Sequence, residues 1–303
     1  MSTEGSTRAI VAALAANIGI ATTKFVAAAV SGSASMLAEA IHSVADSGNQ
    51  VLLIIGGKRS RREATDAHPF GYGRSRYIYA FMVSIVLFSI GGMFSILEGV
   101  SKLGEPHELD NVWLPLTVLG VSIVLESFSL RTALAESKKL RGNQSLVKFV
   151  RHAKAPELPV VVLEDIAALI GLVLAFAGVG LSVVTHNPVF DAYGTLAIGA
   201  LLIVVAVVLG FETSSLLIGE GATDGDAAAI RAALAGSPGV TQVIHMKTLY
   251  LGPDELMLGA KIAVAASATA ADIAKTIDDA ELAVRTAVPA TRVIYLEPDI
   301  LRD

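Results

Sequence analysis

Residues 38–50, AEAIHSVADSGNQ, place a histidine and an aspartate inside an apolar stretch that is long enough to cross a bilayer. His42 and Asp46 are four residues apart, so on a helix they project from one face, one turn above the other. An ionisable side chain in mid-membrane costs about 2.5–3.5 kcal/mol on insertion scales and usually marks a path for ions or protons. This stretch therefore predicts a membrane helix with one functional polar face.

A second stretch of the same kind lies at residues 160–171, VVVLEDIAALIG. It carries Glu164 and Asp165 in an otherwise apolar run, where a carboxylate has no evident structural role. The two stretches together predict a membrane protein that handles a cation.

The composition agrees with a membrane protein. Of the 303 residues, 53% are hydrophobic and only 17% are charged, which is unusual for a soluble domain of this size. Apolar stretches of roughly 20 or more residues predict six transmembrane helices, at about 8–30, 34–57, 77–101, 112–136, 157–185 and 190–215. The sequence becomes charged and periodic after about residue 216, so we expect a six-helix transport domain over 1–216 and a small separate domain over 217–303.

The connections between these helices predict the orientation. Twelve basic residues fall in two connections on one side, and the opposite side offers only Lys102; the twelve are Lys58, Arg59, Arg61, Arg62, Arg74, Arg76, Lys138, Lys139, Arg141, Lys148, Arg151 and Lys154. The positive-inside rule puts both basic connections and both termini in the cytoplasm, and we expect a multi-pass protein of the cell inner (plasma) membrane. Topology accounts for these basic residues, so no nucleic-acid partner is expected.

Two further features narrow the class of protein. The chain has no cysteine, which excludes disulfides and thiolate metal sites. The first apolar run is too long for a secretory leader, so we expect no cleavable signal peptide.

The C-terminal segment has the pattern of a small cytoplasmic α+β domain. Thr-x-x-Asp pairs that begin at Thr223 and Thr269 predict two helix starts. Alternating runs around 240–250 and 256–265, joined by a Gly-Pro-Asp turn, predict a hairpin, and a last strand is expected at 292–296. The order αββαβ predicts an open-faced, ferredoxin-like sandwich.

An imidazole and carboxylates form a ligand set that suits Zn²⁺ and neighbouring divalent ions. His42 and Asp46 would supply two donors from one helix, and Asp165 is the natural partner from another. The alternative is structural: a core histidine bonded to a backbone carbonyl, and a carboxylate tied to a serine or to the histidine. The cost of burying all three groups in a membrane favours the metal site.

Two motifs on this topology resemble those of the cation diffusion facilitators. They are His42-Ser-Val-Ala-Asp46 on the second helix and His68-Pro-Phe-Gly-Tyr-Gly-Arg74 in the connection that follows. The resemblance implies six transmembrane helices followed by a cytoplasmic αββαβ domain. It also implies a homodimer that exchanges a divalent metal for protons and moves the metal out of the cytoplasm.

The chain departs from the common family pattern on the fifth helix. Val161 stands where a histidine is usual, four residues before Asp165, and Glu164 precedes that aspartate as in one branch of the family. Adjacent helical residues diverge by about 100°, so both carboxylates cannot point squarely into one site. The fourth ligand is therefore open among Glu164, Glu39, Asn49 and water. Zn²⁺ is favoured, with Mn²⁺, Fe²⁺ or Co²⁺ as alternatives for a site with one histidine.

Two other charges in the apolar helices have two interpretations each. Lys24 is expected to extend its ammonium group to the membrane surface, and a charge pair with Glu39 is the alternative. Glu126 either lines the translocation path as a proton relay or pairs with a basic residue.

Family members can hold further metal in the connection after the second helix and in the soluble domain. Tyr72 replaces the second histidine of the loop site, so His68 is expected to be a hydrogen-bonded loop residue. The soluble domain has one histidine, His245, and we expect it to dimerise through a hydrophobic sheet face rather than to bind metal.

The sequence thus predicts a proton-coupled exporter of a divalent cation, with no cofactor beyond the transported ion. Two alternatives come from other classes: a metal-responsive membrane scaffold and an intramembrane metalloenzyme. No zincin or nucleophile motif supports an enzyme.

Overall fold

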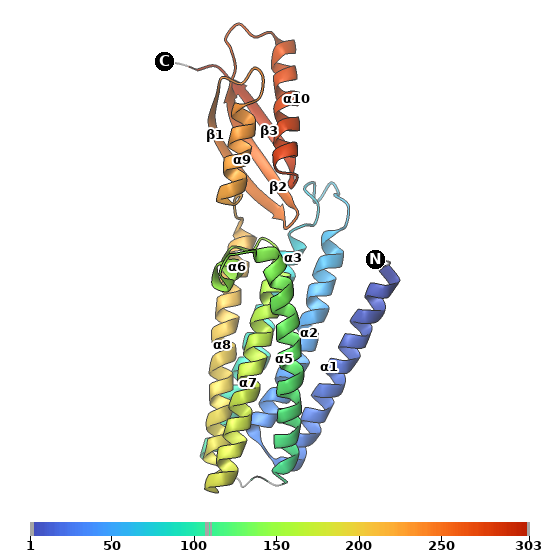
Figure 1. The fold of residues 1–303 in the computed structure, drawn as a ribbon, viewed down its shortest axis with the longest axis vertical. Helices are drawn as coiled ribbons and strands as arrows, with labels where there is room; N and C mark the ends of the chain where they lie inside the picture. The colour runs from blue at the N-terminus through green and yellow to red at the C-terminus, as the bar shows by residue number, and fades with distance from the viewer. Residues whose placement is uncertain (1–2, 107–108, 110, 302–303) are drawn as a thin grey trace. The chain divides into compact units, whose positions relative to one another are not determined.

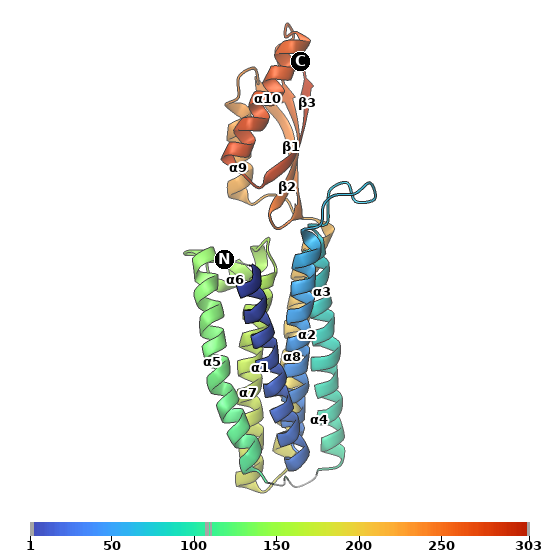
Figure 2. The same ribbon diagram turned by 90° about the vertical axis from the view of Figure 1, so that its right-hand side faces the viewer.

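The computed structural model describes residues 3–106, 109 and 111–301. The chain divides into two compact units, the first made of residues 1–56 and 79–213 and the second of residues 57–78 and 214–303. The first unit is a bundle of long helices, and the second contains a small sheet with two helices (Figures 1 and 2).

The helices that precede the sheet follow the apolar stretches of the sequence closely. Their bounds are α1 Thr3–Ser31, α2 Ala34–Ser60, α3 Ser75–Val86, η1 Leu87–Met93, α4 Phe94–Gly104, α5 Trp113–Arg141, α6 Leu146–His152, α7 Glu157–Thr185 and α8 Val189–Ile218. The segments α3, η1 and α4 form one continuous helix, Ser75–Gly104.

Among the described residues, four helices are long and apolar enough to cross a membrane: Ser75–Gly104, α5, α7 and α8. The other two expected spans are helical as predicted, as α1 and α2. In α2 the apolar run is interrupted by buried polar side chains, Glu39, His42 and Asn49 among them. These polar side chains also lower the hydropathy of α2.

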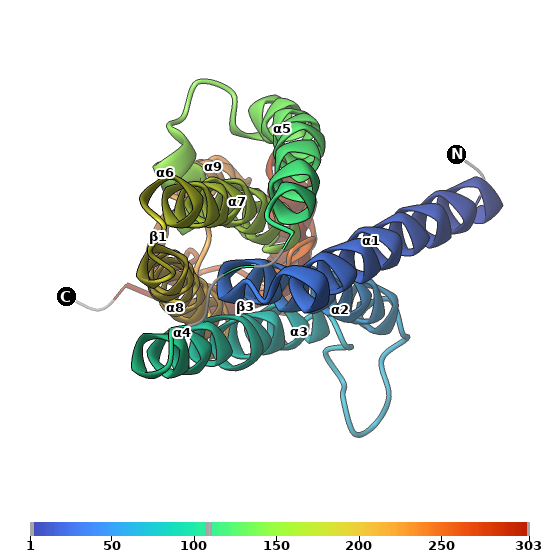
Figure 3. The same ribbon diagram turned by 90° about the horizontal axis from the view of Figure 1, so that it is seen from below.

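Small residues allow the helices of the bundle to approach closely. α5 packs along α7, and α1 packs against α5 (Figure 3). A Cβ atom on Gly99 of α4 would lie 2.7 Å from Cγ of Leu196 in α8, and one on Gly199 of α8 would lie 2.9 Å from the backbone nitrogen of Ile96. Only glycine fits at both positions, so α4 and α8 pack backbone against backbone.

The start of α2 is held by a side chain from α8. Asp191, in the first turn of α8, accepts hydrogen bonds from the Ala34 backbone N–H at 2.6 Å and from the Ser33 hydroxyl at 2.8 Å. Its Oδ1 also accepts from the hydroxyl and the backbone N–H of Ser35. One carboxylate therefore accepts from two of the free N–H groups at this helix start, those of Ala34 and Ser35.

Two features of the bundle were not expected from the sequence. The connection at 138–154 was predicted as a loop, but α6 forms within it, and the Ser145 hydroxyl caps this helix by accepting from the Lys148 N–H. The third span was predicted as a plain α-helix, but η1 is a π-helical turn, in which Gly92 packs against Ile203 of α8. Apolar periodicity does not report such an insertion, because it depends on tertiary contact.

The second unit confirms the predicted αββαβ order. Its elements are α9 Asp224–Ala235, β1 Gln242–Gly252, β2 Glu255–Ala263, α10 Ala270–Ala287 and β3 Thr291–Asp299. In the described part of the chain the sheet has the order β1-β2-β3, with β1 antiparallel and β3 parallel to the central strand. Both helix starts are capped as predicted, by Thr223 and by a capping box of Thr269 with Asp272.

The core of this unit lies between the helices and one face of the sheet (Figure 2). Burial alternates along β2, as expected for a sheet with one covered face. The largest fully buried side chains of this core are Ile230, Leu234, Leu256 and Leu258, which come from α9 and β2. Apolar burial thus accounts for the stability of the unit.

The other face of the sheet corrects one expectation. It carries exposed His245, Lys247 and Tyr295 beside Lys261, whose ammonium group lies 3.0 Å from both Glu297 and Asp299. Hydrogen bonds to these carboxylates raise the pKa of Lys261. The predicted hydrophobic dimerisation face is therefore wrong for the described residues, because the face is mixed and largely charged.

The connection between α2 and α3 folds on itself. The rings of His68 and Tyr72 meet edge to face with centroids 4.6 Å apart, and the Arg62 guanidinium lies 5.5 Å from the Tyr72 ring centroid. The His68 N–H donates to the Thr65 carbonyl at 2.9 Å. The backbone N–H and the ring contact hold His68 in this loop, and the role of its imidazole stays a prediction.

Candidate metal centre

A cavity of about 180 Å³ lies inside the first unit, between α1, α2, α5 and α7. Its polar lining comes from all four helices: Asn17, Lys24, His42, Ser43, Asp46, Gln50, Ser122, Glu126, Ser129, Glu164 and Asp165. The two stretches singled out in the sequence therefore line the same space.

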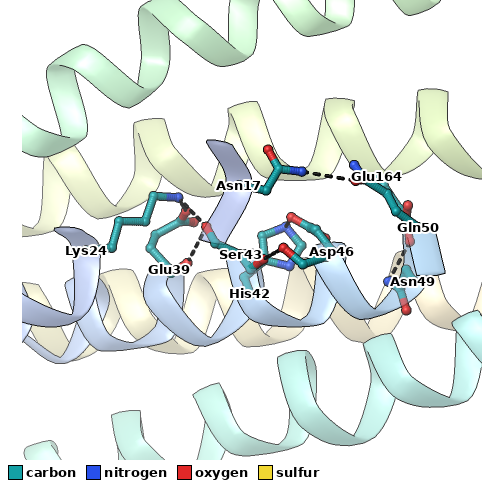
Figure 4. Close-up of polar contacts among 10 residues, drawn as sticks. Asn17, Lys24, Glu39, His42, Ser43, Asp46, Asn49, Gln50 and Glu164 are labelled. Carbon is teal, nitrogen blue, oxygen red and sulfur yellow. Dashed lines mark hydrogen bonds and ion pairs between the residues drawn. The ribbon is translucent and has the colours of Figure 1, made fainter. Parts of the chain in front are cut away.

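The α2 wall presents the predicted histidine and aspartate. The His42 side chain is 1% exposed and that of Asp46 is 25% exposed, and 3.6 Å separates His42 Nε2 from Asp46 Oδ2 (Figure 4). Both ring nitrogens of His42 and Oδ1 of Asp46 are buried without a hydrogen-bond partner among the described residues. Buried polar atoms without partners cost about 1–3 kcal/mol each, so they point to a ligand in the cavity.

The α7 wall presents two carboxylates that are held apart. Asp165 accepts a hydrogen bond from the Ser129 hydroxyl of α5 at 3.0 Å, and Glu164 accepts one from the Asn49 amide of α2 at 2.7 Å. Both acids line the cavity. They point to different neighbouring helices, in agreement with the angular divergence of adjacent helical residues.

The structure places the remaining candidate ligands behind this wall of α2. Glu39 and Asn49 are 0% exposed and do not line the cavity. Glu39 pairs with Lys24, whose ammonium group lies 3.1 Å from Glu39 Oε2. Lys24 is only 4% exposed, so its expected extension to the membrane surface is wrong and the alternative pair with Glu39 is correct.

Glu126 lines the cavity from α5, one turn from Ser129. In the described part of the chain no basic side chain forms an ion pair with it. The alternative of an ion pair is thus not seen among the described residues, and the proton relay stays a prediction.

The described residues include no group of three or more histidine, aspartate or glutamate side chains arranged to hold a metal ion. His42 and Asp46 face the same cavity as Asp165, but the α7 carboxylates are bonded to Ser129 and Asn49 instead. Divalent ions prefer such nitrogen and oxygen donors. Asp165 could take part in binding through its other oxygen, because the Ser129 hydroxyl donates to Oδ2 alone.

A comparison with known protein families finds a match over the helices that form the cavity. The profile of the cation efflux transmembrane domain matches residues 10–218, which include every residue that lines the cavity. The chain belongs to this family. It is a multi-pass membrane protein of the cation diffusion facilitators, a family of metal transporters, as the two motifs predicted.

Two proteins of similar sequence have names that refer to zinc transport and to metal tolerance. The "proton-coupled zinc antiporter SLC30A9, mitochondrial" of Xenopus laevis is 31% identical over 241 residues, which cover 79% of this chain and 43% of that protein. "Metal tolerance protein C4" of Arabidopsis thaliana is 31% identical over 259 residues, which cover 85% of this chain and 57% of that protein. The chain thus spans about half the length of these relatives.

A solved structure, the nickel form of a variant of the C-terminal domain of MamM, matches 26% of the chain and all of that domain. The two are 19% identical, with a TM-score of 0.25.

Three polar residues that line this cavity were not singled out in the sequence: Asn17, Ser43 and Gln50. Gln50 could have been found, because it continues the spacing of four that joins His42 to Asp46. Asn17 donates to Gln50 at 3.1 Å across α1 and α2, a contact that sequence spacing does not reveal.

Proposed function

We propose that this chain is a proton-coupled antiporter that exports a divalent metal cation, Zn²⁺ before others, from the cytoplasm. The observation that carries the proposal is the cavity in which unpartnered atoms of His42 and Asp46 face the carboxylates of α7. Membership of a metal transporter family supports it. So does the printed name of the 31% identical relative, a proton-coupled zinc antiporter.

The proposed metal ligands are His42, Asp46 and Asp165. Glu164 is a possible fourth ligand, and its alternative role is to carry protons beside the site. Glu39 and Asn49 are weaker candidates, because each already bonds to another cavity side chain, Lys24 and Glu164 respectively. A set with one imidazole and several carboxylates binds Zn²⁺ and also admits Mn²⁺, Fe²⁺ or Co²⁺. The metal panel of the experiment below decides among them.

Proton coupling follows from the chemistry of these ligands. Imidazole and carboxylates bind a metal ion only when deprotonated, so binding releases protons. Protonation of the same groups from the other side of the membrane competes the ion off. A helix rearrangement that opens the cavity to each side in turn converts this competition into antiport.

We further propose a homodimer in the cell inner (plasma) membrane, with residues 1–216 as the transport domain and residues 217–303 as a cytoplasmic domain. The twelve basic residues on one side of the predicted helices support this orientation. The uncovered sheet face around Tyr295 is the candidate for contact between two copies, through polar and aromatic groups.

The test uses purified protein in liposomes that contain a metal-sensitive dye and a pH-sensitive dye. Zn²⁺, Mn²⁺, Fe²⁺, Co²⁺ and Cd²⁺ are added in turn, with the Asp165→Ala protein as control. We expect metal movement with opposite proton movement, fastest for Zn²⁺, and neither signal in the control. Metal movement without proton movement would refute the coupling.

The same experiment distinguishes a transporter from the other two classes of protein. Both a membrane scaffold and an intramembrane metalloenzyme would bind metal without any flux. Equal flux in the wild type and in Asp165→Ala would remove Asp165 from the site.

A further inference from the structure

An ion pair joins α1 to α2 deep inside the bundle. The Lys24 ammonium group donates to Glu39 Oε2 at 3.1 Å and to the Ser43 hydroxyl at 2.8 Å (Figure 4). The two charged side chains are 5% and 0% exposed. A buried ion pair seldom repays its desolvation in stability, so its presence in a membrane helix bundle calls for a functional reason.

The carboxylate of this pair has spare capacity for a cation. Glu39 Oε1 is buried and has no hydrogen-bond partner among the described residues. It lies against α7, where a Cβ atom on Gly171 would come within 2.6 Å of it. Glu39 is therefore only half satisfied by the lysine.

The ammonium group shares the cavity with the proposed metal ligands. Lys24 and Ser43 line the cavity beside His42 and Asp46, whereas Glu39 does not line it. Lys24 is the one lysine or arginine among the lining residues described. It pairs with a buried carboxylate and also borders the space in which the metal ion would bind.

We propose that Lys24 is a positioning residue that acts as an intramolecular cation: it neutralises Glu39 and so tunes the affinity of the neighbouring site for the divalent ion. The inference rests on the proposed cation transport. A fixed positive charge in the cavity weakens binding of the ion and favours its release, and Glu39 limits that repulsion by pairing with it. A transporter needs this balance, because an ion held too tightly does not leave.

The proposed electrostatic role predicts opposite changes in metal affinity for the two members of the pair, which a purely structural role does not. Replacing Lys24 leaves the Glu39 carboxylate free to attract the divalent ion, so affinity should rise. Replacing Glu39 leaves the ammonium group unopposed, so affinity should fall. If the pair only stabilised the fold, both replacements would lower the affinity.

The experiment measures the Zn²⁺ dissociation constant of the purified full-length chain by titration with Zn²⁺ in detergent micelles. We expect Lys24→Gln to bind about tenfold more tightly and Glu39→Gln about tenfold more weakly, where each tenfold change is 1.4 kcal/mol. The neutral pair Lys24→Gln/Glu39→Gln and the conservative Lys24→Arg should stay within about threefold of the wild type. Lys102→Gln is the matched control, because Lys102 lies at the end of α4 and outside the cavity.

Weaker binding in both single variants would overturn the inference, and so would an effect of Lys24→Gln no larger than that of Lys102→Gln. If Lys24→Gln does not fold, the neutral pair decides: the inference expects it to restore the Zn²⁺ affinity that Glu39→Gln loses, whereas a purely structural pair predicts no restoration. Asp165→Ala separates this inference from the proposed function. Loss of Zn²⁺ binding there with no effect at Lys24 refutes only the inference, whereas absence of Zn²⁺ binding by the wild type refutes both.

Discussion

The two units of this chain handle charge in opposite ways. In the first unit, charged and polar side chains such as Lys24, Glu39 and His42 are buried, and several of their atoms lack partners among the described residues. In the second unit, the charges of Lys261 and Glu297 pair at the surface and the core is apolar. The first unit therefore buries charges and unpaired polar atoms at a cost in stability, whereas the described core of the second unit is apolar and its charges lie at the surface.

The largest difference in transport should appear when one carboxylate is neutralised in each unit in turn. Asp46→Asn takes a proposed ligand from the cavity while keeping its shape, and we expect transport to fall at least about 100-fold. Substitution of a residue that only orients a metal ligand typically lowers metal affinity or activity 10–100-fold. Glu297→Gln is the matched change on the open sheet face, and transport should stay within about twofold. The assay is initial Zn²⁺ uptake into liposomes at equal protein content.

Circular dichroism and gel filtration of the Asp46→Asn protein serve as controls, because the comparison requires an intact fold. Near-normal uptake by a folded Asp46→Asn protein would contradict the proposed site. A large loss in Glu297→Gln would show that the second unit does more than fold.

A smaller effect is expected at the second carboxylate of α7. Glu164 accepts a hydrogen bond from Asn49 at 2.7 Å and diverges from Asp165, so Glu164→Gln should keep the Zn²⁺ affinity within about threefold. It should instead lower the number of protons moved per metal ion, because an amide does not carry a proton as an acid does. Paired metal and pH dyes measure that ratio. Asn49→Ala is the control for loss of the hydrogen bond with the acid retained.

Loss of Zn²⁺ binding in Glu164→Gln as large as that in Asp165→Ala would make Glu164 a metal ligand. A proton-to-metal ratio equal to that of the wild type would show that Glu164 does not carry the transported protons.

The smallest effect should come from a helix cap in the second unit. Thr269 begins α10 in a capping box with Asp272, and Thr269→Ala should cost about 1 kcal/mol of stability. Faster hydrogen exchange in α10 of the full-length protein would report this loss, while Zn²⁺ transport should not change. Slower transport would show that α10 takes part in it.

The same cap should depend on pH. Hydrogen bonds from the Thr269 hydroxyl and backbone N–H lower the pKa of Asp272 below its ordinary value. A carboxyl whose pKa is lower in the folded state stabilises the fold above its unfolded pKa, about 3.9, and loses this effect as the pH falls through the folded pKa. Exchange in α10 of Asp272→Asn should therefore exceed that of the wild type near neutral pH and approach it in acid.

Sequence patterns predicted the helices, the caps and the αββαβ order because each depends on neighbours within a few residues. The capping box at Thr269 is such a local signal. The π-helical turn at Leu87–Met93 was missed; its Gly92 lies against Ile203 of α8, a contact that the apolar pattern of one helix does not report. The polar character of the sheet face was also missed, although Lys261 alternates with buried residues and Lys247 lies between half-buried ones.

The candidate site was predictable only along single helices. A spacing of four placed His42 and Asp46 on one face, and the structure confirms that both line a cavity. The partners from other helices were not predictable: Ser129 for Asp165 and Asn49 for Glu164 are 36 and 115 residues away in sequence. Which groups meet across a bundle depends on helix rotation and crossing, which the apolar pattern of one helix does not specify.

Asp191 ties one end of α2 to one end of α8. Its carboxylate ties the first residues of α2 to the first turn of α8, so these two helix ends move as one. Any tilt of α2 relative to α8 must then be small at this end and grow along the helix, past His42 and Asp46 toward Ser60. In such a tilt the proposed metal ligands on α2 would be displaced in proportion to their distance from Asp191, so Asp46 would move farther than His42.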